Sequence, residues 1–175
     1  RQDSMKFSSY NASDGLKIDQ YIPGARFKDE NGIIYFGGIG GLVMFDPSDF
    51  KKNEYIPPVY LTDFQLSYKS VQPAQKGSPL KQHIAFTDRI KLSHRQNMIT
   101  INYVALNYMS PRKNQYECML EGQEKEWQKM GTRQEATYTN ISPGKYIFHV
   151  RASNNDGVWN TEGTRVKIVI TPPWW

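Results

Sequence analysis

The side chains that could carry out catalysis are few and scattered in this sequence. The three histidines, His83, His94 and His149, lie in separate segments, and no HExxH pattern or metal-site spacing occurs. The one cysteine, Cys118, falls on an inward position of a predicted strand, whereas a nucleophilic thiol needs partial exposure and a nearby positive charge. We therefore expect no catalytic residue, no metal and no cofactor in this chain.

Carboxylates and glycines form two further groups that could take part in catalysis or binding. Glu121, Glu124 and Glu126 are near enough in sequence for paired acid–base chemistry, but lysines lie close by, and we interpret this segment as a solvated turn. Residues 154–156 offer oxygens for Ca²⁺ without an EF-hand pattern, so a plain turn is favoured. The glycine-rich segment 36–41 lacks the Lys-Ser/Thr and the following helix of a phosphate-binding loop.

The tryptophans are the remaining candidates for binding. Trp127 and Trp159 could stack on sugar rings, but packing at the core and corners of the fold is the favoured interpretation. Trp174 and Trp175 follow a Pro-Pro pair at residues 172–173. Tandem tryptophans are typical of the membrane–water interface, so we expect these two to be membrane-proximal. Packing against the base of the domain is the alternative.

Composition narrows the class of protein. The 175 residues carry 22 Lys and Arg against 17 Asp and Glu, a net charge of +5, with no run of basic residues longer than two. A nucleic-acid-binding surface would require a basic stripe, so we expect no nucleic-acid partner. Aromatic residues make up 13% of the chain, which argues against disorder. No long apolar run, signal peptide or initiator Met occurs, so we expect an excised segment of a longer protein.

The elements that must position these residues are strands. Apolar residues alternate at period two and turn residues interrupt them at short intervals, which predicts an all-β chain. The Pro57-Pro58 pair marks a boundary between two regions, because it cannot continue a helix or a central strand. The first region is predicted to be a short antiparallel meander, with strands at 24–27, 33–36 and 42–45.

The second region is predicted to hold about seven strands, which matches an immunoglobulin-like or fibronectin III-like β-sandwich. A Pro-Gly turn followed by Tyr146 predicts a tyrosine corner, in which the hydroxyl bonds upstream backbone. Val104, Leu106 and Ile147 are apolar at outward positions and are candidates for a dimer face. The strands are expected at 59–68, 84–86, 90–92, 98–108, 115–120, 136–139, 145–153 and 165–171.

Residues 113–160 strongly resemble the two-component regulator three-Y domain, also written Y_Y_Y, and the resemblance extends over about 57–175. The resemblance implies structural roles for a set of motif residues, and the three tyrosines of the name would be Tyr116, Tyr138 and Tyr146. The motif residues are Tyr116, Leu120, Glu121, Gly122, Trp127, Ala136, Thr137, Tyr138, Pro143, Gly144, Tyr146, Asn154, Asp156, Gly157 and Trp159.

Residues 10–47 resemble the last repeat of the regulator β-propeller that precedes this domain in such receptors. Asp14-Gly15-Leu16, the Phe-Gly-Gly of residues 36–38 and Phe45-Asp46-Pro47 are among the matching positions. A single blade cannot close a propeller, because each blade buries its faces on its neighbours. We therefore expect a remnant blade plus linker at 1–56 and the three-Y sandwich at 57–175.

The resemblance implies a parent that is a hybrid two-component sensor histidine kinase in the inner membrane. Its upstream propellers would sense an oligosaccharide in the periplasm, and this domain, as a homodimer beside the membrane, would relay that signal to control transcription. The ligand would bind mainly outside this segment, and the segment would not be an enzyme. The alternatives are a carbohydrate-binding module of a secreted glycan-degrading protein, with Trp127 or Trp159 as its platform, and a plain structural spacer.

Overall fold

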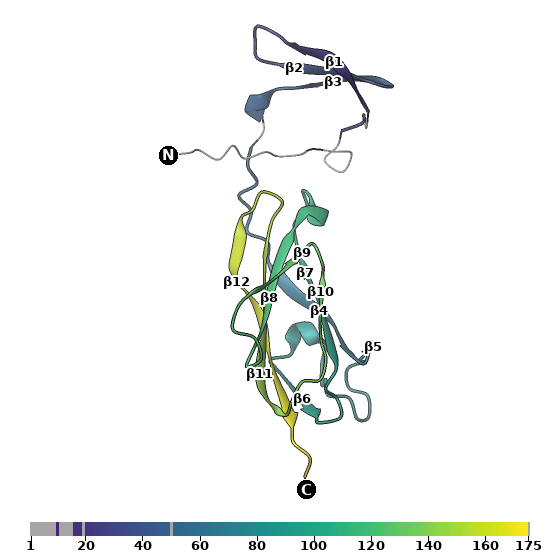
Figure 1. The fold of residues 1–175 in the computed structure, drawn as a ribbon, viewed down its shortest axis with the longest axis vertical. Coiled ribbons are helices and arrows are strands. Elements are labelled where there is room, and N and C mark those ends of the chain that lie inside the picture. The colour runs from purple at the N-terminus through teal and green to yellow at the C-terminus, as the bar shows by residue number, and fades with distance from the viewer. Residues whose placement is uncertain (1–9, 11–15, 19, 50, 175) are drawn as a thin grey trace. The chain divides into compact units, whose positions relative to one another are not determined.

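The computed structural model describes residues 10, 16–18, 20–49 and 51–174 (Figure 1). The chain divides into two compact units, Arg1–Lys52 and Asn53–Trp175, and each is described by itself. Strands and short 3₁₀ turns are its regular elements over the described ranges. Within those ranges, no helix has the length and apolar character needed to cross a membrane. The predicted all-β class is confirmed.

The first unit is a three-stranded antiparallel sheet in chain order, as the meander pattern predicted. It consists of β1 (Tyr21–Lys28), β2 (Ile34–Gly38) and β3 (Gly41–Phe45), followed by the 3₁₀ turn η2 (Pro47–Asp49). Gly32 has a φ of 90°, a conformation that only glycine adopts at little cost, and it closes the β1–β2 hairpin. The predicted propeller positions Asp14 and Gly15 lie outside the described residues.

The second unit is a sandwich of two sheets. One sheet has the order β10-β7-β4-β5 and the other has the order β6-β12-β11-β8-β9. The strands are β4 (Val59–Leu66), β5 (Lys69–Ser70), β6 (Arg89–Ser93), β7 (Ile99–Ala105), β8 (Gln115–Glu121), β9 (Gln128–Gly131), β10 (Glu135–Tyr138), β11 (Gly144–Ser153) and β12 (Trp159–Thr171). Short 3₁₀ turns η3 (Ile84–Phe86) and η4 (Pro111–Lys113) interrupt the connections.

Alternation builds the core between the two sheets. In β7 the side chains of Ile99, Ile101 and Tyr103 are almost fully buried, and in β11 those of Phe148 and Val150 are buried in the same way. Residues between them face outward, as period-two strands require. Burial of these apolar side chains is the main term that stabilises the sandwich.

Two predicted elements differ from the structure. Residues Ile84–Phe86 form the 3₁₀ turn η3 and not a strand, because three apolar residues in a row carry no periodicity that separates the two conformations. β12 begins at Trp159 and not near residue 165. Its first half is mostly polar, so alternation does not reveal it. The short strands β5 and β9 were also not expected; neither has alternating apolar residues.

Strand register places one set of turns at the same end of the sandwich. Thr171, the last residue of β12, lies opposite Ser93 at the end of β6. Gly144 at the start of β11 lies opposite Ile170. Backbone bonds from Ile141 to Asn97 and from Ser67 to Met98 join the remaining turns to this end. We call it the exit end; it comprises residues 67–69, 91–98, 139–145 and 171–174.

Candidate functional site

A cluster of asparagines lies at the opposite end of the sandwich, where the second unit begins. Asn53, Asn107, Asn114 and Asn154 are each at most 6% exposed. Asn154 Nδ2 donates to the carbonyl oxygens of Asn53 (2.6 Å) and Tyr55 (2.8 Å). Asn53 in turn donates its backbone N–H to Asp156 Oδ2 at 2.6 Å. This network, which we call the asparagine clamp, ties the first residues of the unit to the β11–β12 turn.

The interior of the clamp satisfies its own polar groups. Asn53 Nδ2 and Asn107 Nδ2 both donate to Asn155 Oδ1, at 2.9 and 3.0 Å. Asn107 Nδ2 also donates to Asn114 Oδ1 at 2.9 Å, and Asn114 donates to the Ala105 carbonyl at 3.0 Å. A buried amide without such partners would cost about 1–3 kcal/mol. The clamp is therefore a specific joint that tolerates little rearrangement.

The clamp explains why the second unit begins at Asn53 and not at the Pro57-Pro58 pair. The segment 53–56 precedes those prolines, yet its backbone is bonded by Asn154. Asn160 of β12 adds a bond to the Pro57 carbonyl at 3.0 Å. Asn154 and Asp156 are motif residues in the sequence, and Asn107 lies in the upstream segment that also fits the resemblance, while Asn53 and Asn114 were not singled out. Their wide separation in sequence left no local signal.

The three motif tyrosines have separate structural roles. Tyr116 is 1% exposed, and its hydroxyl accepts the Ala105 N–H at 3.1 Å, across the two sheets. Tyr138 donates to Glu124 Oε2 at 3.2 Å. Tyr146 donates to the Ser142 carbonyl at 2.9 Å, which is the tyrosine corner that the turn pattern predicted. The three tyrosines do not form one site, because each hydroxyl bonds a different segment of the chain.

Two of the motif glycines, Gly122 and Gly144, make room for Tyr146. Gly122 has a φ of 100°, and a Cβ there would lie 2.9 Å from both the Lys145 carbonyl and the Tyr146 ring. A Cβ on Gly144 would lie 3.1 Å from the Tyr146 hydroxyl. Pro143, the other residue of this turn, is exposed. Leu120, by contrast, is fully buried in the core.

The two motif tryptophans flank Arg151 on the outer face of the five-stranded sheet. The Arg151 guanidinium carbon lies 4.1 Å from the ring centre of Trp127 and 5.9 Å from that of Trp159. Arg151 Nε also donates to Glu117 Oε2 at 2.8 Å. A cation over an indole is attracted by the ring quadrupole. One face of Trp127 is thus occupied by Arg151, which leaves less of it for a sugar ring.

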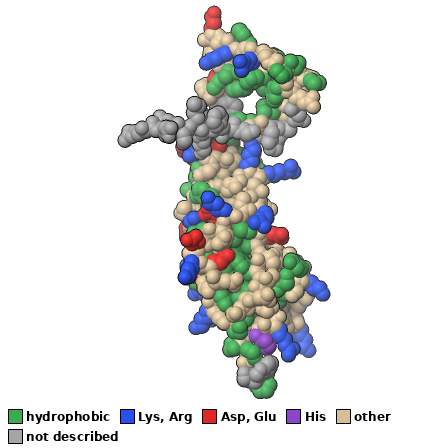
Figure 2. Space-filling view, viewed as in Figure 1, with side chains coloured by type: hydrophobic (Ala, Val, Ile, Leu, Met, Phe, Trp, Pro, Cys, Tyr) green, Lys and Arg blue, Asp and Glu red, His purple; other side chains and the backbone are tan. Residues whose placement is uncertain are grey.

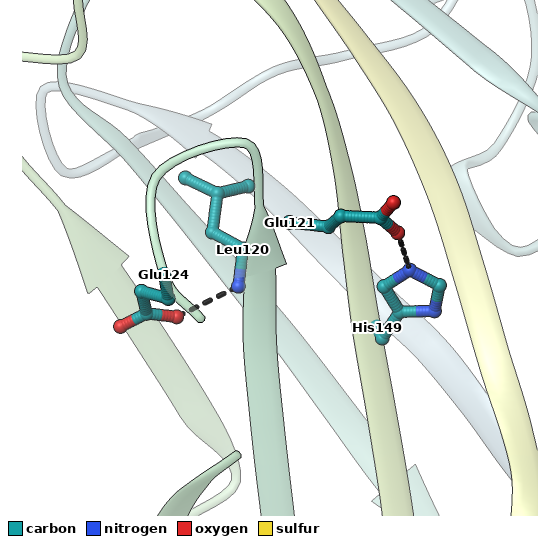
Figure 3. A network of polar contacts seen from close by, with 4 residues as sticks. All are labelled: Leu120, Glu121, Glu124 and His149. Atoms are coloured by element: carbon teal, nitrogen blue, oxygen red, sulfur yellow. Dashed lines mark hydrogen bonds and ion pairs between the residues drawn. The ribbon is translucent and has the colours of Figure 1, made fainter. Parts of the chain in front are cut away.

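Figure 3 shows two carboxylates on either side of the turn after β8. Glu121 lies 2.8 Å from His149 Nε2 on β11, and Glu124 accepts the Leu120 N–H at 2.7 Å (Figure 3). Glu124 therefore closes its own turn, and its carboxylate is not freely solvated. This differs from the solvated turn that the sequence predicts for this segment. Glu124 also accepts a hydrogen bond from the Tyr138 hydroxyl, so both of these bonds hold parts of the fold together.

Cys118 lies between the sheets and is 1% exposed. Burial raises the pKa of its thiol to about 11, and its nearest polar partner is the Tyr138 hydroxyl at 3.7 Å. The thiolate is therefore scarce at neutral pH. Over the described ranges, no three His, Cys, Asp or Glu side chains gather as metal ligands.

The candidate dimer residues lie on two different sheets. Val104 is an outward residue of β7, opposite Tyr60 of β4. Leu106 follows β7 directly, and its N–H bonds the Pro58 carbonyl. Ile147 is on β11 of the other sheet. The three residues therefore cannot form one continuous face, because the core separates the two outer surfaces. Of the two tryptophans that the sequence predicts to be membrane-proximal, Trp174 is 92% exposed, and Trp175 lies outside the described residues.

The chain is similar to a known domain family, to a known protein and to solved structures. Residues 107–171 match the model of the Y_Y_Y domain. The chain is 34% identical over 166 residues to Histidine kinase P4 of Formosa agariphila, spanning 94% of this chain and 12% of that protein. The extracellular domain of BT3049, a candidate hybrid two component system from B. thetaiotaomicron, aligns with a TM-score of 0.71 at 32% identity, covering 94% of this chain and 22% of that one.

A further relative shares the fold. Two structures of the extracellular domain of BT4673 from B. thetaiotaomicron align with a TM-score of 0.63 at 27% and 26% identity, over 85% and 86% of this chain and 20% of theirs. BT4673 is described in one as a candidate one component system and in the other as a candidate hybrid two component system. The resemblance drawn from the sequence is confirmed: residues 107–171 match the Y_Y_Y domain, in a chain related to the extracellular part of two-component sensors.

Proposed function

We propose that this chain is the membrane-proximal periplasmic relay of a hybrid two-component sensor histidine kinase in the inner membrane. Upstream propellers of the same chain bind an oligosaccharide, and the sandwich passes the resulting displacement across the membrane to control transcription. The chain itself has no catalytic role in this scheme. The parent's kinase activity, ligand and regulated genes belong to the proposal, because the chain spans only 12% of its curated relative.

The observation that carries the proposal is a continuous connection between the two ends of the sandwich. The asparagine clamp bonds Asn53 and Tyr55 to the turn that begins β12. β12 then runs from Trp159 to Thr171 and pairs with both β11 and β6. A hydrogen-bonded strand is stiff, so a displacement applied at residues 53–55 reaches Thr171 as a movement of the whole sandwich.

Ligand would act by favouring one of two arrangements of a receptor dimer. A ligand can shift such an equilibrium only by its difference in affinity for the two states. Rigidity of the sandwich supports this scheme, because a flexible asparagine clamp would not transmit a displacement at residues 53–55 to Thr171. The proposal includes a dimer contact through one of the two outer surfaces. That surface lies either around Val104 and Leu106 or around Ile147.

Disulfide cross-linking in cells tests the relay. Thr171→Cys in the full-length receptor would form cross-links whose yield changes when a polysaccharide digest that induces the regulated genes is added. Asn154→Ala should reduce that change, and Gln123→Ala, an exposed residue of the β8–β9 turn, should leave it intact. An unchanged yield with and without inducer in the parent receptor would contradict the proposal.

A further inference from the structure

The exit end of the sandwich carries a one-sided charge. Its cations are Lys69, Lys91, Arg95 and Lys145, with His94 beside them, and residues 67–69, 91–98, 139–145 and 171–174 contain no Asp or Glu. All four Lys and Arg side chains are exposed. Among the described residues, none of the four has an ion-pair partner. The β8–β9 turn beside Lys145 adds Glu121, Glu124 and Glu126 with Lys125, so the surplus of positive charge lies on the side of the exit end away from that turn. Figure 2 shows basic side chains and a histidine gathered toward this end on the face in view.

Register brings these cations together from distant parts of the sequence. Lys91 of β6 and Lys145 of β11 both lie opposite Val169 of β12, on its two sides. Lys69 begins β5 and lies opposite Leu66. The clamp end differs, because Glu54, Asp156 and Glu162 lie there beside Arg112 and Lys113. The surplus of positive charge is therefore a property of one end and not of the whole surface.

The same charge continues up the outer face of the five-stranded sheet. A cleft of about 310 Å³ is lined by Arg89, Lys145 and Lys167, together with Glu121. Glu121 is already engaged by His149. Arg89 lies directly opposite Lys167 in the neighbouring strand, and like charges in this position destabilise a sheet. An anionic partner would remove this repulsion.

Two exposed aromatic side chains lie among the cations. Tyr68 is 69% exposed at the tip of the β4–β5 hairpin, and Trp174 is 92% exposed just beyond Thr171. Ser67 and Tyr68 have φ values of 48° and 64°, in a turn that normally takes Asn and Gly. A bulky residue in this conformation is strained, and such strain is commonly found where function requires it. Here it holds an aromatic ring out from the fold.

We propose that the exit-end surface docks on the anionic headgroups of a lipid membrane. Lysines and arginines attract anionic lipid, and Tyr and Trp rings settle at the level of the headgroups. Both occur together here, around the point where β12 leaves the sandwich. This inference rests on the proposed function for its location beside a membrane. It adds that the sandwich itself, and not only the residues after Thr171, contacts the bilayer and fixes its own orientation.

Vesicle binding by the 175-residue chain tests the proposal. We expect binding to phosphatidylcholine vesicles that contain phosphatidylglycerol, no binding to pure phosphatidylcholine, and loss of binding at high salt because of screening. Tryptophan fluorescence should shift to shorter wavelength as Trp174 leaves water. Equal binding, or none, to both vesicle types would overturn the proposal. The result does not depend on signalling, so it stays separate from the cross-linking test of the relay.

Matched variants locate the surface. Lys91→Gln combined with Lys145→Gln should weaken binding to anionic vesicles roughly 30-fold. Arg112→Gln combined with Lys129→Gln removes the same charge away from the exit end and should change it less than twofold. Tyr68→Ala should weaken binding to vesicles and leave binding to dextran sulfate unchanged. Equal losses for the two charge variants, or binding to anionic vesicles that Tyr68→Ala leaves unchanged, would show a general polyanion effect and overturn the lipid assignment.

Discussion

Asn154 donates its side-chain amide to the backbone carbonyl of Asn53 at 2.6 Å, across 101 residues of sequence. The bond joins the first residue of the second unit to the turn between β11 and β12. Because both groups are buried, water cannot replace the bond at low cost. The position of this one side chain therefore governs how firmly the first residues of the second unit are joined to the β11–β12 turn.

Asn154→Ala is expected to lower the free energy of unfolding by about 3 kcal/mol, because the buried carbonyl of Asn53 and the part-buried carbonyl of Tyr55 both lose their donor. Urea unfolding followed by circular dichroism measures this loss. Limited proteolysis should also show faster cleavage within residues 53–56. Gln123→Ala is the control and should change neither measurement. A loss no larger than that of the control would mean that the clamp contributes little.

Gly163 in β12 is expected to be far less tolerant than the motif residue Gly157. Gly163 has a φ of 58°, and a Cβ there would overlap the Val150 carbonyl oxygen, at the bulge where β11 and β12 change register. Gly157 has a φ of 77° with open space around it. Gly163→Ala should cost at least about 2 kcal/mol, and Gly157→Ala about 1 kcal/mol. Equal costs in urea unfolding would contradict the close packing at the bulge.

Arg151 and Trp127 are expected to be energetically coupled. A double-mutant cycle with Arg151→Met and Trp127→Leu should give a coupling of about 1 kcal/mol, from the stacked guanidinium. The same cycle with Trp159→Leu serves as the control and should give less, because that ring centre is 5.9 Å away. Arg151→Lys should not restore stability, since an ammonium cannot stack flat and bond Glu117 together. Absence of coupling in the first cycle would count against the stack.

Alkaline pH is expected to destabilise the protein. Burial raises the pKa of Cys118 from 9.0 to about 11, and burial raises those of Tyr103 and Tyr138 above 10.0. The folded state therefore holds protons that the unfolded chain releases, so the free energy of unfolding falls as pH rises above about 9. Cys118→Ala should make the fall between pH 9 and pH 11 less steep. Urea midpoints that stay constant over this range would contradict the buried environment of the thiol.

Thiol labelling gives an independent check on the same residue. The folded protein should react slowly with a thiol reagent at neutral pH, because Cys118 is 1% exposed. Labelling should become rapid in urea concentrations that unfold the sandwich. Rapid labelling without urea would mean that the two sheets open readily.

Local pattern predicted much of the fold because strand formation and turns depend on neighbouring residues. Alternation located β8 and β11, and the Pro-Gly-x-Tyr sequence predicted the hydrogen bond from Tyr146 to Ser142. The same method missed β9, whose residues Gln128–Gly131 do not alternate. It also took Ile84–Phe86 for a strand. Short segments carry too few side chains for a period to be recognised.

The sequence by itself determined the all-β class, the Y_Y_Y motif and the tyrosine corner, because each depends on residues that are close in the chain. Only the tertiary structure decided which asparagines meet around Asn53, which cations share the exit end, and that Val104 and Ile147 face opposite ways. Those outcomes depend on the register between strands far apart in sequence. Register is set by burial of one face of each strand against the other sheet, a condition that no single segment contains.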